Sequence, residues 1–196
     1  MFTSTGGALY GNAAPRPTPE THPPAPLSPY GASKWAAEAY VRTWANATGV
    51  GHTVCRLANV YGPRQSPHGE AGVVSILAHL LRQGERPTLY GHGRATRDYV
   101  HVSDVAEALL RACGANEVFN ISTGRETEVV EIFDHLAKAA GVTVEPRLAP
   151  LRDGELELSC MDPTHAERTL GWRAKIDLVG GLPATYHALV AGFAAA

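Results

Sequence analysis

The chain has 196 residues, and 17 Lys and Arg against 19 Asp and Glu give it a formal net charge of −2. This balance disfavours a nucleic-acid partner and a polybasic membrane contact, and no apolar run reaches the 18 residues typical of a membrane span. The three scattered cysteines, Cys55, Cys113 and Cys160, are predicted to be reduced thiols in a cytoplasmic protein. Neither they nor the nine histidines form a metal-ligand pattern, so no metal site is predicted.

The first predicted element is a short strand that begins at Met1 and runs into hydroxyls and glycines, TSTGGALYG, at residues 3–11. In open α/β sheets, ligands bind beyond the carboxyl ends of the strands. The hydroxyls of Ser4 and Thr5 are therefore candidates to hydrogen-bond a substrate oxygen there. Residues 13–29 hold seven prolines and show no periodicity, and they are predicted to form a loop over the same site.

A helix is predicted over residues 31–48. Ser28 is a suitable N-cap, and Pro29 suits the first turn of a helix. The periodicity predicts one apolar side for this helix. The side chains on that side are Trp35, Ala39, Tyr40 and Trp44.

Tyr30 and Lys34 lie four positions apart at the start of this helix, so they share one face. A tyrosine hydroxyl with its ordinary pKa of about 10 is a poor base at neutral pH, and lowering that pKa to about 7 requires roughly 4 kcal/mol in favour of the phenolate. An ammonium group about 4–5 Å away in a partly desolvated site supplies roughly that much. The pair is a candidate general base with its tuner, although the same spacing also occurs in helices without a catalytic role.

The rest of the chain alternates short strands with longer helices, which is typical of an α/β fold. Strands are predicted at residues 52–57, 88–90, 98–102, 118–121 and 142–146. Helices are predicted at residues 73–83, 104–112 with Ser103 as cap, 128–140 with Thr127 as cap, 162–171 and 178–193. Residues 61–72 and 150–158 are predicted to be loops.

Together these segments resemble the extended short-chain dehydrogenase/reductase family, in its NAD-dependent epimerase/dehydratase branch, and most closely its UDP-glucose 4-epimerase members. The matching stretches, in chain order, are STGGALYG (4–11), SPYGASK (28–34), RLANVYGPR (56–64), RDYVHVSDVA (97–106), FNISTG (119–124) and LGW (170–172). The resemblance implies the C-terminal part of a Rossmann-type parallel sheet in residues 1–65. It implies that residues 66–196 are mainly a smaller α/β domain that binds a nucleotide sugar.

The resemblance also implies catalytic roles. Tyr30 would be the base, and Lys34 would tune it and bind the ribose of the cofactor NAD, which Ala58 would contact through its backbone. The catalytic hydroxyl would belong to Thr5 or Ser4. The glycine pair after Thr5 adds about one residue to the loop, so which of the two takes this place stays open.

The substrate implied by the resemblance is a UDP-sugar, with Asn59 at the sugar nucleotide and Arg97, Arg152 and Glu155 at the uridine diphosphate. The planar fork of arginine suits phosphate oxygens. Without the resemblance, the alternatives are a surface ion pair at Arg97, a solvated surface at Arg152 and Glu155, and a turn at Asn59.

One part of the family pattern is absent from the sequence. No G-x-G-x-x-G or G-x-x-G-x-x-G motif links a strand to a helix, and the nearest glycine pair, Gly91 and Gly93, is predicted to be a tight turn. We therefore expect the chain to lack the N-terminal NAD-binding half of the family and to bind NAD weakly, with a sheet edge left unpaired.

Epimerisation at C4 needs one base, one hydroxyl donor and tightly held NAD. The 4,6-dehydratases of the family have an Asp-Glu acid/base pair directly after the loop threonine, where this chain has Gly6 and Gly7. The loop thus favours epimerisation, without choosing among UDP-glucose, UDP-N-acetylglucosamine and UDP-glucuronate. The resemblance implies an isomerase that interconverts UDP-glucose and UDP-galactose. A nucleotide-sugar reductase or dehydratase of the same family, or an inactive truncated paralogue, stays open as an alternative. A homodimer is implied by the resemblance alone.

Overall fold

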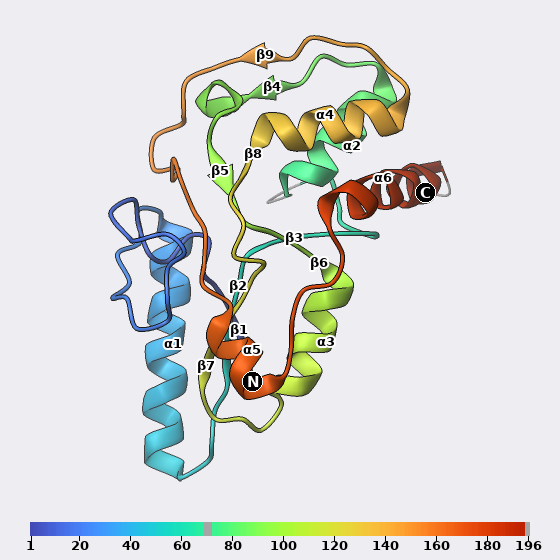
Figure 1. Ribbon diagram of the computed structural model, residues 1–196. Coiled ribbons are helices and arrows are strands. Elements are labelled where there is room, and N and C mark those ends of the chain that lie inside the picture. The colour runs from blue at the N-terminus through green and yellow to red at the C-terminus, as the bar shows by residue number, and fades with distance from the viewer. Residues whose placement is uncertain (69–71, 195–196) are drawn as a thin grey trace.

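The computed structural model describes residues 1–68 and 72–194, which form two packed groups of elements, drawn as the lower and upper parts of Figure 1. In the lower part, three parallel strands form a sheet in the order β1-β2-β7. They are β1 (Phe2–Thr5), β2 (Val54–Leu57) and β7 (Val118–Ile121). Helix α1 (Pro29–Thr48) lies on one side of this sheet, and α3 (Val102–Ala112) lies on the other (Figure 1). These parallel strands and helices confirm the predicted α/β class.

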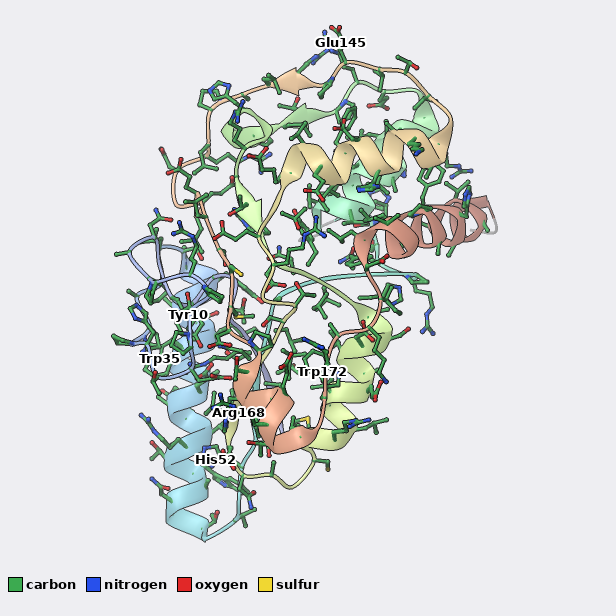
Figure 2. The ribbon with its side chains drawn as sticks, viewed as in Figure 1. Tyr10, Trp35, His52, Glu145, Arg168 and Trp172 are labelled. Atoms are coloured by element: carbon green, nitrogen blue, oxygen red, sulfur yellow. The ribbon has the colours of Figure 1, made fainter. Side chains whose placement is uncertain are left out.

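The core of the lower part is formed by apolar side chains from the sheet, from α3 and from α5 (Thr164–Leu170). Trp172, labelled in Figure 2, is 1% exposed, and its indole Nε1 donates a hydrogen bond of 2.9 Å to the backbone oxygen of Asp104. Burial of such a side chain contributes about 1.5–3 kcal/mol. Trp172 therefore fastens the segment after α5 to the first turn of α3.

The upper part is a second core between three helices. They are α2 (Val73–Gln83), α4 (Val129–Ala140) and α6 (Leu178–Ala194). Above them in Figure 1 runs a short parallel pair of β4 (Thr88–Leu89) with β9 (Arg147–Leu148), and a 3-10 turn, η1 (Tyr90–Gly93), follows β4. Gly91 and Gly93 both have positive φ in that turn, as a tight turn requires.

Two further strand pairs connect the parts. They are the parallel pair β3 (Asn59–Tyr61) with β6 (Tyr99–His101) and the antiparallel pair β5 (Thr96–Arg97) with β8 (Thr127–Glu128). The domain boundary near residue 65 stays a prediction, since residues from both sides of it form the lower core. The chain later returns to that core with α3, β7 and α5. No helix among the described residues is both long and apolar enough to cross a membrane.

Helix α1 begins as predicted. The Ser28 side chain accepts a hydrogen bond of 3.1 Å from the backbone N–H of Gly31, and Pro29 occupies the first turn. The predicted apolar side is wrong, however, because Tyr40 is 79% exposed and Trp44 is 57% exposed.

The residues of α1 that the structure buries are instead Gly31, Glu38 and Ala45, seven positions apart. A carboxylate takes the middle place on this buried line because an arginine of the sheet pairs with it.

Two predicted helix caps are also wrong. Helix α3 begins at Val102, and the cap is His101, whose Nδ1 accepts a hydrogen bond of 3.2 Å from the N–H of Ser103. Helix α4 begins at Val129 after Glu128, which makes no side-chain cap bond. Thr127 cannot cap α4 because it is paired in β8, opposite Arg97.

The strand predicted at residues 142–146 is also wrong, because the strand in this region is β9, at Arg147–Leu148. The N–H of Val142 still bonds the carbonyl of Ala137 at the end of α4. Pro146 has no N–H to donate to a ladder. Arg147 is the residue whose backbone N–H begins the ladder with the segment around β4, by donating to Pro87 O at 2.8 Å.

Candidate active site

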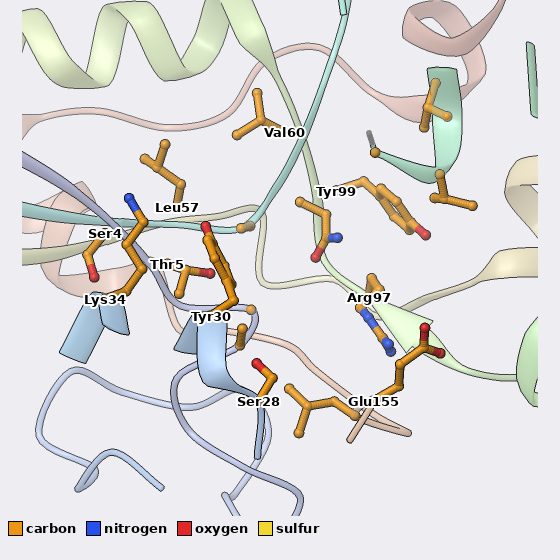
Figure 3. Close-up of a pocket in the computed structure, with 18 of the residues that line it drawn as sticks. Ser4, Thr5, Ser28, Tyr30, Lys34, Leu57, Val60, Arg97, Tyr99 and Glu155 are labelled. Carbon is orange, nitrogen blue, oxygen red and sulfur yellow. The ribbon is translucent and has the colours of Figure 1, made fainter. Parts of the chain in front are cut away.

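A cavity of about 670 Å³ opens beyond the carboxyl ends of β1 and β2, next to the first turn of α1 (Figure 3). This is the position that open α/β sheets offer to ligands. Eight of the nine residues predicted for the site line this cavity: Ser4, Thr5, Tyr30, Lys34, Ala58, Asn59, Arg97 and Glu155. The ninth, Arg152, is not among the lining residues.

Tyr30 and Lys34 lie on the side of α1 that faces the cavity. The Tyr30 side chain is 45% exposed, and Lys34 Nζ lies 5.9 Å from the centroid of its ring. Lys34 Nζ also donates a hydrogen bond of 3.2 Å to the backbone oxygen of Thr3. An ammonium group has three donors, so Lys34 retains donors for a ligand while it stays beside Tyr30.

The two candidate hydroxyls come from successive residues of β1. Ser4 and Thr5 are 4% and 8% exposed, and they point to opposite faces of the strand, as neighbouring residues do. Within residues 1–68 and 72–194, Ser4 Oγ is sealed from solvent and finds no hydrogen-bond partner, whereas Thr5 Oγ1 is not among the sealed atoms. Thr5 is thus the hydroxyl that a ligand in the cavity can reach.

Ala58 and Asn59 follow β2 and line the cavity. The N–H of Ala58 donates to Ile121 O at 3.0 Å, so a backbone contact with a ligand there would use the Ala58 carbonyl. Asn59 is in β3 rather than in a turn, and its N–H donates to Asp98 O at 2.8 Å. Its side chain lies close to Gly7, where a Cβ atom would come within 3.0 Å of Asn59 Oδ1.

Arg97 brings a half-buried positive charge to the cavity wall. Its Nη1 donates to the backbone oxygens of Thr96 (2.7 Å) and Glu157 (3.3 Å). No carboxylate among the described residues lies within 4.0 Å of its guanidinium, and burial lowers the pKa of Arg97. A buried cation without a close counter-ion is costly on its own, and an anion in the cavity would offset that cost.

Asp98, the residue next to Arg97, is buried and binds the turn after β7. Its carboxylate is 2% exposed and accepts hydrogen bonds from Thr123 N (2.9 Å), Thr123 Oγ1 (2.7 Å) and Gly124 N (2.9 Å). Burial raises the pKa of Asp98, and the bonds from Thr123 and Gly124 act in the opposite direction. The strand that carries Arg97 is thereby fastened to the turn after β7.

Arg152 lies just outside the cavity. Its guanidinium carbon lies 3.7 Å from the centroid of the Tyr90 ring, and its Nη1 lies 3.8 Å from Glu155 Oε1. Glu155 itself lines the cavity. Arg152 thus contacts a residue that lines the cavity, Glu155, while its contact with the Tyr90 ring keeps the guanidinium at the rim of the cavity.

Gln65 and Tyr99 also line the cavity, and they are not among the residues predicted for the site. Within the described part of the chain, Gln65 Oε1 and the Tyr99 hydroxyl are buried and have no hydrogen-bond partner. A buried polar atom without a partner calls for a ligand or a water molecule. Tyr99 could have been found from its place two residues after Arg97, because alternate residues of an extended chain share a face. Gln65 gives no such signal.

No metal centre is visible in the described ranges, where no three His, Cys, Asp or Glu side chains gather around one point. Cys55 and Cys160 are buried free thiols, and Cys113 is an exposed one. Burial raises the pKa of Cys55 to about 11 and that of Cys160 to about 12. Both buried thiols are therefore held protonated and are poor nucleophiles.

Residues 1–185 match the family model described as GDP-mannose 4,6 dehydratase. Among curated proteins, the chain is 43% identical over 183 residues to a putative UDP-glucose 4-epimerase of Methanocaldococcus jannaschii, covering 93% of this chain and 60% of that protein.

Two solved structures of UDP-glucose 4-epimerases are also similar to the chain. A Thermotoga maritima UDP-glucose 4-epimerase with UDP-glucose is 44% identical, with a TM-score of 0.93 over 98% of this chain and 63% of that one. A Thermus thermophilus UDP-glucose 4-epimerase in complex with NAD is 40% identical, with a TM-score of 0.88 over 96% and 63%. The chain thus spans about three fifths of the length of these relatives.

Proposed function

Because the chain belongs to the NAD-dependent epimerase/dehydratase family, the family of the GDP-mannose 4,6 dehydratase model, we propose that it acts as a UDP-sugar 4-epimerase, with UDP-glucose and UDP-galactose as the substrate pair. The observation that carries this proposal is the composition of the cavity. A tyrosine with a neighbouring ammonium group and a reachable hydroxyl line it, and so does an arginine that has no carboxylate within 4.0 Å among the described residues.

In this reaction Tyr30 takes the proton from the C4 hydroxyl of the sugar and later returns it. Its 45% exposure leaves the phenol open to the cavity, as a base requires. The Lys34 ammonium lies 5.9 Å from the centroid of the Tyr30 ring, next to the proposed base. The Thr5 hydroxyl hydrogen-bonds the same sugar oxygen and so directs its proton toward Tyr30.

The residues present fit the nicotinamide ribose part of NAD. Lys34 has unused donors for ribose hydroxyls, Tyr30 lies one turn away, and the Ala58 carbonyl, with two lone pairs, can act as an acceptor. When bound, NAD supplies the oxidation of C4 and its reduction from the other face. Residues 1–68 and 72–194 hold no glycine-rich turn between a strand and a helix that could receive the pyrophosphate of NAD.

The diphosphate of the substrate would bind Arg97. Its guanidinium is half-buried and lacks a carboxylate partner within 4.0 Å in the part of the chain that is described. Arg152 would reach the same group from the rim, with Glu155 between them to accept from substrate hydroxyls. Asn59 also lines the cavity and would contact the sugar.

A dehydratase is the second candidate because the family contains such enzymes. Elimination of water needs an acid and a base beside the hydroxyl loop, and glycines stand there instead. At Gly6 a Cβ atom would overlap the sulfur of Met161, so a larger side chain there would require the Met161 side chain to move. The absence of acid/base groups at Gly6 and Gly7 therefore favours epimerisation. An NADPH-dependent reductase would use the same tyrosine and lysine.

We also propose that the protein forms a homodimer in the cytoplasm. The support for the dimer is the apolar surface of α1, where Tyr40 and Trp44 are exposed. The support for the compartment is the presence of three free cysteines, since reduced thiols persist in the cytoplasm. Sedimentation analysis of the wild type and of Trp44→Glu tests the dimer.

The function is tested by incubating the chain with UDP-galactose and NAD and separating the products by anion-exchange chromatography. Formation of UDP-glucose supports the proposal. A UDP-4-keto-6-deoxy sugar would identify a dehydratase, and turnover that requires stoichiometric NADPH would identify a reductase. No conversion, in a chain that binds UDP-glucose and at a NAD concentration raised until the rate no longer depends on it, would contradict the epimerase proposal for this chain.

A further inference from the structure

An arginine and a glutamate are buried together between α1 and the central sheet, outside the cavity. Arg56 of β2 and Glu38 of α1 are each 5% exposed. Arg56 Nη2 lies 2.8 Å from Glu38 Oε2, and Arg56 Nε lies 3.1 Å from Glu38 Oε1. The contact is thus a bidentate pair, the arrangement that gives an ion pair its most specific geometry.

Stability alone does not account for this pair. Replacement of a buried ion pair by apolar side chains of similar size is often neutral or stabilising, because the desolvation of two charges offsets their attraction. Arg56 interrupts an otherwise apolar strand, and Glu38 interrupts the line of small residues that α1 turns toward the sheet. The pair has a fixed direction and geometry, which an apolar contact would not provide.

Glu38 is the largest side chain on the buried line of α1. The other buried residues of the helix are Gly31 and Ala45, which offer the sheet almost no side chain to hold. Gly31 is pressed so closely against Ala8 O that a Cβ atom would clash with it. Apart from Trp35, which packs against the lower core, and the bond of Lys34 to Thr3 O, the contact that fixes the rotation of the helix about its axis is therefore that of Glu38.

That rotation decides where Tyr30 and Lys34 point. Lys34 is four positions before Glu38 and lies one turn away on nearly the same face. Each residue of an α-helix corresponds to a rotation of about 100° and a rise of about 1.5 Å. A small change in the position of the Glu38 carboxylate would therefore rotate the helix and move Tyr30 and Lys34 relative to β1.

Arg56 also holds the loop that follows Thr5. Its Nη1 donates a hydrogen bond of 2.8 Å to the hydroxyl of Tyr10, and that hydroxyl donates one of 2.9 Å to Asn120 Oδ1. Tyr10 is drawn next to Trp35 and α1 in Figure 2. In the sheet, Arg56 stands in register with Ser4 on one side and with Asn120 on the other. One guanidinium thus contacts both the helix that carries Tyr30 and the loop that leaves β1.

We infer that Arg56 and Glu38 are positioning residues, and that their pair sets the rotation of α1 so that Tyr30 and Lys34 face the hydroxyl of Thr5. Neither side chain lines the cavity, and neither would touch the substrate. The kinetic consequence of this inference rests on the proposed function, but the geometric one does not.

The geometric test uses Lys34 as a reporter. Its Nζ lies 5.3 Å from the centroid of the Phe2 ring and 5.9 Å from that of Tyr30, so ring currents should displace its ε-methylene resonance. The chain has only two other lysines, Lys138 and Lys175, and lysine labelled with ¹³C at Cε therefore gives a simple spectrum with internal references.

The variant is the double substitution Glu38→Leu/Arg56→Met, which removes both charges and leaves no unpaired ion. We expect it to fold and to lose the displacement of the Lys34 resonance. The control is Glu131→Leu/Arg125→Met, which removes an exposed pair of the same 2.8 Å length. It should leave the Lys34 resonance where it is.

A Lys34 resonance that stays displaced in the folded double variant would overturn the inference, as would the lack of any displacement in the wild type. If the double variant does not fold, Glu38→Gln serves instead. Its amide keeps one hydrogen bond to Arg56 but loses the charge, and a partial shift of the resonance is expected. An unchanged resonance in that variant would again overturn the inference.

The kinetic test measures kcat and KM for UDP-galactose in the same variants. Misplacement of a catalytic group by about 1 Å costs roughly 100-fold in rate, so kcat should fall by about that factor while KM changes little. A purely structural role would lower the melting temperature and leave kcat per folded molecule unchanged. If the wild type itself shows no turnover, the proposed function fails, and the resonance experiment still decides the inference.

Discussion

Lys34 reaches from α1 to the backbone of β1, where its Nζ donates a hydrogen bond of 3.2 Å to the carbonyl oxygen of Thr3. This bond joins the helix that carries Tyr30 to the strand that carries Thr5. Lys34 is thus a neighbour of the proposed base, and it also links α1 to β1, which both line the cavity.

Tyr30→Phe should abolish most of the interconversion of UDP-galactose and UDP-glucose. The substitution removes the hydroxyl but keeps the ring, and general base catalysis contributes roughly 100- to 10,000-fold. Because Tyr30 is 45% exposed, the fold should not suffer. Initial rates and the melting temperature measure the two effects. A rate close to that of the wild type would refute the assignment of Tyr30 as the base.

The two candidate hydroxyls should differ in importance. Thr5→Val should lower kcat strongly, because the hydroxyl of Thr5 is open to the cavity, whereas Ser4 Oγ is sealed. Ser4→Ala removes a buried atom without a partner among the described residues, and it should leave kcat nearly unchanged and the stability equal or higher. Steady-state kinetics and thermal melting of both variants test which of the two hydroxyls is the catalytic one. The reverse order of kcat losses would transfer the role to Ser4.

Arg97→Met should weaken the binding of UDP. A hydrogen bond to a charged group is worth about 1.5–3 kcal/mol, which corresponds to roughly 10- to 150-fold in affinity. Isothermal titration calorimetry with UDP measures this without any need for turnover. Arg125→Met is the matched control, because Arg125 is paired with Glu131 away from this cavity. Equal affinities of both variants for UDP would remove Arg97 from the diphosphate site.

Local signals in the sequence predicted the parts of the structure that depend on neighbouring residues. The start of α1 follows from Ser28 and Pro29, whose capping and backbone preferences act within one turn. The position of Tyr30 and Lys34 in the cavity follows from that helix and from the end of β1. Each of these steps uses residues that are close together in the chain.

The errors come from contacts between distant residues. The buried side of α1 was predicted wrongly because Glu38 is buried by Arg56, which lies 18 positions away. Thr127 does not cap α4 because it pairs with Arg97, 30 positions away. Arg152 lies at the rim because the Tyr90 ring, far from it in the chain, attracts its guanidinium. Such partners cannot be chosen from one sequence by periodicity or propensity.

NAD alone should raise the melting temperature of this chain little or not at all, whereas UDP should raise it. A ligand stabilises the folded state by RT ln(1 + [L]/Kd), and the described residues offer contacts to the nicotinamide ribose but no glycine-rich cradle for the pyrophosphate. Scanning fluorimetry over a series of NAD concentrations tests this. A clear NAD-dependent rise would show that the ribose contacts of Lys34 and Tyr30 suffice for binding.

Acidification should destabilise the protein partly through His101. Its Nδ1 must be unprotonated to accept the N–H of Ser103 at the start of α3. Burial lowers the pKa of His101, while the nearby Asp104 acts in the opposite direction. The unfolded chain therefore binds this proton more readily than the folded protein does. The stability that results is present above the unfolded value of about 6.5 and is lost as the pH falls through the lower, folded value.

The variant His101→Asn isolates this contribution, because asparagine keeps a side-chain acceptor for the helix cap but does not titrate. Its melting temperature should fall less than that of the wild type between about pH 7.5 and about pH 5. The other eight histidines are common to both proteins, so their effect cancels in the comparison. If the melting temperatures of the two proteins fell equally with pH over this range, His101 would not change its protonation when the protein unfolds. The helix cap would then tolerate a charged imidazole.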